Sequence, residues 1–175
     1  MMFKLLVLGV SLVASPEYAS TLSQQVDTEV VVMSYSGQGV DEVAEHLDEA
    51  LAHGPTHIVI CAGINDIAGQ APTPKVVSKL ATLLARIRAA SPTTKIALAT
   101  ISPWRAHIGC HWRATVKVNE WITSVADVDV IIDLSSMGKN GYLLEKFNAG
   151  DGLHFNWRGA REFARLTAIA VNAHR

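Results

Sequence analysis

The stretch Phe3-Lys4-Leu5-Leu6-Val7-Leu8 is an almost continuous apolar run that leads into Gly9-Val10-Ser11-Leu12. Continuous runs of this length are typical of strands that are buried on both faces of a parallel sheet. Four more such runs follow along the chain, at residues 29–33, 57–62, 95–100 and 128–134. We therefore predict a five-stranded parallel sheet whose first strand is formed by residues 3–8.

Helical periodicity fills the intervals between these runs. Apolar residues recur every three or four positions in residues 40–51, 76–87 and 163–170. Ser15-Pro16-Glu17 is typical of a helix start, and Asn156 is a plausible N-cap for the last helix. Strands that alternate with helices predict a doubly wound, three-layer α/β/α fold of the flavodoxin-like kind. The length of 175 residues fits one domain over residues 1–175.

The N-terminal run has a second interpretation. One lysine, a short apolar stretch and the small residues that follow it resemble a secretory signal peptide. Cleavage there would remove a strand from the sheet together with Ser11. We favour the strand interpretation.

The composition of the chain argues against several classes of function. Hydrophobic residues make up 49% of the chain, charged residues 18%, and the formal net charge is −1, which gives no electrostatic case for nucleic acid or an anionic membrane. No apolar run is long enough to be an integral membrane segment. Cys61 and Cys110 form no disulfide framework, which favours the cytoplasm. Cys110 lies in an expected loop near His107 and His111, but the spacing matches no common zinc motif, and we predict no metal site.

Residues with reactive or polar groups follow the predicted strands. Ser11 follows the first run, Gly37 the second and Asn65 the third, whereas Asp151 and His154 lie just before the last helix. Ligands of doubly wound sheets bind at the carboxyl ends of the strands. Together these residues supply a hydroxyl nucleophile, a base with an orienting acid, a backbone N–H and an amide donor. Those are the parts of an acyl-transfer site.

In their order and local sequence these residues resemble the SGNH hydrolases, the GDSL-type lipase and esterase superfamily. The resemblance runs through Gly-Val-Ser-Leu at 9–12, Ser-Gly-Gln-Gly at 36–39, Gly-Ile-Asn-Asp at 63–66 and Asp-Gly-Leu-His at 151–154. It implies Ser11 as nucleophile, His154 as base and Asp151 as its orienting acid. It also implies an oxyanion hole formed by Ser11, Gly37 and Asn65, with no cofactor. Asp66 is expected to be a structural anchor.

One position departs from the family pattern, because Val10 stands where the GDSL block has aspartate. In the family this aspartate supports the loop, so we expect activity to survive. A catalytically weak or inactive glycan-binding module is the alternative. An α/β-hydrolase would need a G-x-S-x-G motif at its nucleophile, and the sequence has none. A dinucleotide-binding domain would need G-x-G-x-x-G after the first strand, and that motif is absent too.

The substrate is expected to be a small or short-chain acyl ester. Acetylated sugars, thioesters and lysophospholipids all remain open. The segment after the fourth run carries the candidate pocket residues Trp104, His107, Ile108 and Trp112. These side chains could line an acyl or sugar pocket, or form a hydrophobic lid over the core.

Overall fold

A computed structural model describes residues 3–104 and 109–175 of the chain. Its main sheet contains five parallel strands in the order β2-β1-β3-β4-β5. The strands are β1 Leu5–Gly9, β2 Val30–Ser34, β3 His57–Cys61, β4 Lys95–Ala99 and β5 Val130–Ile132. This is the flavodoxin-like strand order, so the predicted sheet is confirmed.

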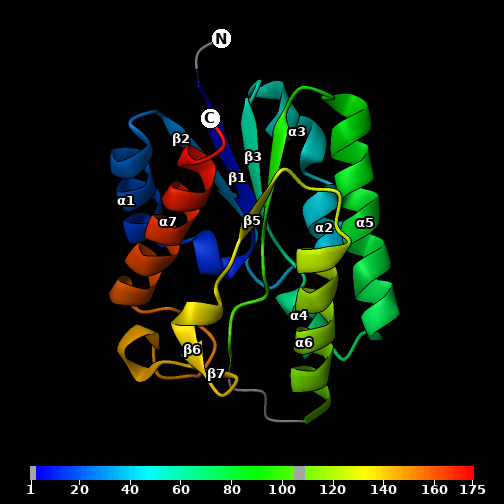
Figure 1. The fold of residues 1–175 in the computed structure, drawn as a ribbon, viewed down its shortest axis with the longest axis vertical. Helices are drawn as coiled ribbons and strands as arrows, with labels where there is room; N and C mark the ends of the chain where they lie inside the picture. The colour runs from blue at the N-terminus through cyan, green and yellow to red at the C-terminus, as the bar shows by residue number, and fades with distance from the viewer. Residues whose placement is uncertain (1–2, 105–108) are drawn as a thin grey trace.

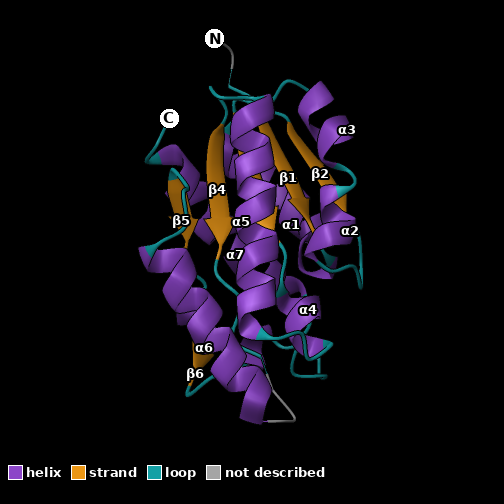
Figure 2. Cartoon of the chain, turned by 90° about the vertical axis from the view of Figure 1, so that its right-hand side faces the viewer, coloured by secondary structure: helices purple, strands orange, loops and turns teal. Residues whose placement is uncertain are grey.

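Helices cover both faces of the sheet and complete the three predicted layers (Figures 1 and 2). On one face lie α1 Pro16–Val26 and α7 Trp157–Asn172, which pack against each other. On the other face lie α2 Val40–Ala44, α3 Leu47–Ala52, α4 Ile64–Ala68, α5 Thr73–Ala90 and α6 Gly109–Ser124. A short hairpin, β6 Gly138–Lys139 and β7 Tyr142–Leu143, lies near the carboxyl ends of the strands (Figure 1).

The N-terminal apolar run is a central strand of the sheet. All five residues of β1 are buried, and Leu5 is in register with both Val30 of β2 and His57 of β3. The strand interpretation is therefore confirmed.

Two predicted helix starts are also confirmed. The Ser15 hydroxyl accepts the N–H of Glu17 at 3.1 Å, with Pro16 at the first helical position of α1. The Asn156 side chain accepts the N–H groups of Arg158 and Gly159 at the start of α7. Each cap satisfies donors that the first helical turn leaves without an acceptor.

Other boundaries differ from the prediction. The helical stretch at 40–51 is two helices, α2 and α3, and the fifth strand is only three residues long. Residues 109–112, expected in a loop, form the first turn of α6. The buried face of α6 is formed by His111, Thr115, Val118 and Ile122, so two of its four residues are polar. A hydrophobic pattern therefore does not show its start.

None of the helices in the described part of the chain combines the length and the apolar character needed to cross a membrane.

Candidate active site

Ser11 begins a short 3-10 helix, Ser11–Val13, directly after β1. A Cβ at Gly9 would lie 2.9 Å from the Cys61 carbonyl oxygen, so only glycine lets β1 approach β3 this closely. The Val10 N–H then donates to the same Cys61 oxygen at 3.1 Å. Val10 itself is fully buried. Packing and backbone hydrogen bonds, including those of the Val13 and Ala14 N–H groups to the Val10 and Ser11 carbonyl oxygens, thus hold the turn that presents Ser11.

The Ser11 hydroxyl lies against His154, although 143 positions separate the two residues in the chain. Ser11 Oγ is 3.1 Å from His154 Nε2, and His154 Nδ1 is 2.6 Å from Asp151 Oδ2. A carboxylate can only accept, so Nδ1 carries the proton and Nε2 is left as the acceptor for the Ser11 hydroxyl. The structure therefore brings the three predicted side chains into one chain of hydrogen bonds.

Asp151 is held in its ionised form. The hydrogen bond with the His154 ring, together with the His154 and Leu153 N–H groups that donate to Oδ1, lowers the pKa of Asp151 to about 2. Asp151 thus carries a full negative charge at neutral pH and accepts the hydrogen of His154 Nδ1.

The His154 loop, residues 148–156, is shaped by two asparagines. Asn148 Oδ1 accepts the N–H groups of Gly150 and Gly152, whose φ values of 114° and 80° lie in the left-handed region that favours glycine. Asn156 Nδ2 donates to the carbonyl oxygens of Lys146 and Asn148. The sequence reasoning missed Asn148, although Asn-x-Gly-x-Gly is a turn signal that could have revealed it.

Gly37 and Asn65 follow the strands on either side of β1. Because β1 lies between β2 and β3, the loops after all three strands meet at one edge of the sheet. Gly37 has φ 79°, a left-handed conformation, and a Cβ there would meet nothing within 4 Å. Asn65 Nδ2 donates to the Gln38 carbonyl oxygen at 2.8 Å and so ties the two loops together. Its second amide hydrogen can serve another acceptor.

Asp66 is an anchor, as expected. Its carboxylate is buried and accepts the Val40 N–H at 2.9 Å. It also pairs with Lys79 at 2.8 Å, and Lys79 reaches Asp41 at 2.9 Å. These contacts join α2, α4 and α5 behind the Asn65 loop.

A sequence profile of the GDSL-like lipase/acylhydrolase family matches residues 11–162. The chain belongs to this family. The GDSL-like chain is therefore a carboxylic ester hydrolase, and the predicted family and enzyme class are confirmed. No curated protein matches the chain in sequence.

Solved structures share the fold of this GDSL-like hydrolase at low sequence identity. The lipase/acylhydrolase from Enterococcus faecalis has a TM-score of 0.81 and 18% identity, covering 99% of this chain and 97% of its own. The esterase EstA from Pseudoalteromonas sp., inhibited by monoethylphosphonate, has a TM-score of 0.76 and 20% identity over 98% of each chain. A family 3 carbohydrate esterase from Clostridium thermocellum has a TM-score of 0.75 and 16% identity, covering 98% and 96%.

The predicted pocket residues divide into two groups in the GDSL-like hydrolase. His107 and Ile108 lie outside the described residues. Trp104 and Trp112 line a hollow of about 300 Å³. Trp104 is nonetheless mostly buried, and its Nε1 donates to Thr115 at 3.1 Å, whereas Trp112 is 44% exposed.

The opposite wall of this hollow was not predicted. It is formed by Asn140, Gly141 and Tyr142 of the β6–β7 hairpin. Asn140 and Gly141 both have positive φ, as a two-residue hairpin turn requires, so Asn-Gly was the available signal. Tyr142 also borders a neighbouring hollow lined by Asp151, so the aromatic wall extends towards the His154 loop.

A much smaller hollow lies among buried residues of the core. Its lining includes Leu12, Ile64, Ile101 and Ser102, and its volume is about 10 Å³. That volume is close to the least that can hold one water molecule.

Proposed function

We propose that the protein hydrolyses small or short-chain carboxylic esters through an acyl-enzyme formed on Ser11. The observation that carries this proposal is the chain of hydrogen bonds from Ser11 through His154 to ionised Asp151. A serine, an imidazole and a carboxylate in this geometry are the parts of a nucleophilic acyl-transfer mechanism.

In the proposed reaction His154 Nε2 takes the Ser11 proton while Oγ forms a bond to the ester carbonyl carbon. His154 then gives that proton to the leaving alcohol as the ester bond breaks. A water molecule, deprotonated by the same nitrogen, attacks the acyl-enzyme and releases the acid and free Ser11. Asp151 stays ionised throughout and stabilises the imidazolium.

The oxyanion would be bound by the N–H groups of Ser11 and Gly37 and by the Asn65 amide. Ser11 begins its short helix, so its N–H has no acceptor within that helix. Gly37 N–H donates to no acceptor among residues 3–104 and 109–175. Donors that are already positioned need little rearrangement when charge develops on the substrate oxygen.

The chain has 175 residues and its described part carries no large insertion among its helices and strands, which favours an acyl group of few carbons. We place the uncharged portion of the alcohol part of the substrate at the Trp104, Trp112 and Tyr142 hollow. Aromatic walls suit a sugar or an apolar chain, and one structural relative is a carbohydrate esterase.

The proposed setting is the cytoplasm. Cys110 is an exposed free thiol and Cys61 is a buried one, and such thiols persist where the surroundings are reducing. The proposed partner is a small-molecule ester.

The test is hydrolysis of p-nitrophenyl acetate, butyrate and octanoate. We expect acetate to be turned over fastest, and Ser11→Ala and His154→Ala to lower kcat by about 10⁴-fold or more. The matched control is His53→Ala, an exposed histidine that should leave kcat unchanged. Full activity in a folded Ser11→Ala variant would contradict the proposal.

The second candidate function is a glycan-binding module without esterase activity, which the replacement of the usual aspartate by Val10 motivates. Fluorophosphonate labelling separates the two, because only an activated serine reacts quickly. We expect Ser11 to be labelled and Ser11→Ala to stay unlabelled. A folded wild-type protein that binds a glycan and never labels would favour the binding module.

A further inference from the structure

An exposed aromatic ring with two guanidinium groups lies just after the His154 loop. Trp157, the first residue of α7, is 52% exposed. The guanidinium carbons of Arg158 and Arg161 lie 5.0 and 5.1 Å from the centre of its ring, within cation–π range. The Trp157 ring therefore holds the two guanidinium groups next to it.

Neither of these arginines is neutralised by an ion pair within the described part of the chain. Arg165, one turn further along the same helix, binds Glu162 through two hydrogen bonds. Glu17 of α1 is close enough for Arg161 to lower its pKa, but its carboxylate is bound chiefly by the Ser15 hydroxyl. The pair of guanidinium groups is thus available to an external anion.

The pair also lies near the segments of the chain that carry the reacting groups. Trp157 follows His154 by three positions, which limits their Cα separation to roughly 10 Å. Arg161 acts on Glu17 at the start of α1, and α1 begins five positions after Ser11. The two arginines are therefore near the segments that follow Ser11 and His154 in the chain. The helices that begin there, α1 and α7, lie side by side (Figure 1).

The position of His154 determines where the alcohol part of the ester lies in the proposed mechanism. The leaving oxygen must come within hydrogen-bond distance of Nε2 in order to be protonated, so the alcohol part of the ester lies on the His154 side. We propose that Arg158 and Arg161, held by Trp157, form a subsite for a negatively charged group on the alcohol part of the substrate. This inference rests on the proposed esterase function and adds a substrate class, namely esters whose leaving group is anionic.

The test uses two acetate esters that differ in one charge. These are 4-acetoxy-3-nitrobenzoate and its neutral methyl ester, and each releases a coloured nitrophenolate. For each enzyme the measured quantity is the ratio of kcat/KM for the anionic ester to that for the neutral one. We expect this ratio to fall about threefold for Arg158→Ala or Arg161→Ala and about tenfold for the double variant, mainly through KM. The ratio should also fall as salt is added to the wild-type enzyme.

Arg165→Ala is the matched control, because it removes an arginine of the same helix that is already paired with Glu162. It should leave the ratio unchanged. Trp157→Ala should lower the ratio without changing kcat for the neutral ester, and Trp157→Phe should restore part of it. A double variant that hydrolyses the neutral ester normally and keeps the wild-type ratio would overturn the subsite.

A binding measurement separates this inference from the proposed function. Calorimetric titration with the product 4-hydroxy-3-nitrobenzoate needs no turnover. If neither ester is hydrolysed but the wild type binds this anion and the double variant does not, the subsite stands and the esterase proposal fails. If neither ester is hydrolysed and the wild type does not bind the anion, both fail.

Discussion

At the residue scale, the turn after β1 shows how this chain supports its serine without the usual aspartate. Val10 is fully buried, and its N–H is bound to the Cys61 carbonyl oxygen. Hydrophobic packing and backbone hydrogen bonds therefore hold this turn without a side-chain carboxylate. Val10 is thus part of the hydrophobic core.

We expect Val10→Asp to destabilise the protein rather than improve it. The new carboxylate would be buried among apolar neighbours, at a cost of about 2–4 kcal/mol in the free energy of unfolding. Urea denaturation measures this loss, and Val10→Ile serves as the apolar control. A Val10→Asp variant as stable as the wild type and more active would show that the turn still accommodates the aspartate.

Asn65 has two separable contributions, an oxyanion donor and the tie to Gln38. We expect Asn65→Ala to lower kcat by about 10²–10³-fold with little change in KM, because the lost hydrogen bond forms chiefly in the transition state. Steady-state kinetics check this, and thermal unfolding reports the structural contribution. Unchanged kcat would remove Asn65 from the oxyanion hole.

At the element scale, α7 and the His154 loop depend on one side chain. The Asn156 oxygen caps α7, and its Nδ2 donates to the carbonyl oxygens of Lys146 and Asn148 at the N-terminal end of the loop. The geometry of His154 is therefore coupled to the first turn of the 16-residue helix α7.

Two substitutions at Asn156 should separate these contributions. Asn156→Asp keeps an acceptor for the helix N–H groups but loses both hydrogen bonds to the loop. Asn156→Ala loses the helix cap as well as both hydrogen bonds to the loop. We expect the alanine variant to lose about 1–2 kcal/mol of the free energy of unfolding and the aspartate variant clearly less. Both should lower kcat, since the loop is released in each. Equal stability of the two variants would argue against the cap.

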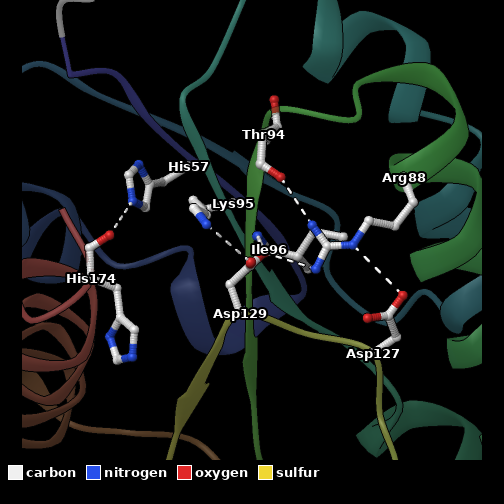
Figure 3. Close-up of polar contacts among 8 residues, drawn as sticks. All are labelled: His57, Arg88, Thr94, Lys95, Ile96, Asp127, Asp129 and His174. Carbon is white, nitrogen blue, oxygen red and sulfur yellow. Dashed lines mark hydrogen bonds and ion pairs between the residues drawn. The ribbon is translucent and has the colours of Figure 1, made fainter.

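At the scale of the whole molecule, a charged network joins three elements at the opposite edge of the sheet from Ser11 (Figure 3). Asp129, just before β5, accepts the Ile96 N–H and pairs with Arg88 of α5 and Lys95 of β4. Burial raises the pKa of Asp129, but these donors outweigh it and hold the pKa below its usual value. Folding therefore favours the ionised carboxylate.

We expect Asp129→Asn to lower the free energy of unfolding by about 1–3 kcal/mol at pH 7. The lowered pKa means that this stabilisation is present above the unfolded-state pKa of about 3.9 and is lost as the pH falls below it. The difference between wild type and variant should therefore shrink between pH 4 and pH 2. Urea denaturation at pH 7 and pH 3 measures it, and a difference that stays constant would contradict this linkage.

Much of the fold could be predicted because its strands are continuous apolar runs and its first and last helices begin with recognisable caps. The start of α6 could not, because His111 and Thr115 occupy its buried face. Ser11, Asp151 and His154 were identified by residue type and local sequence. Their meeting at hydrogen-bond distance depends on strand order and on the conformation of the His154 loop, which no local pattern encodes. Tyr142, which forms part of the wall of the aromatic hollow, could not be predicted, because it lies on a hairpin too short to show strand periodicity.

Ser11 and His154 are 143 positions apart in the chain, so they are synthesised at very different times during translation. β1 leaves the ribosome first, yet its neighbours β2 and β3 must follow before it can pair, and the base arrives only with the last quarter of the chain. A nascent or truncated chain that ends before Asp151 therefore carries a serine with no base to activate it. Reactivity of Ser11 towards a phosphonate would consequently report completed folding, because it appears only once both ends of the chain have docked.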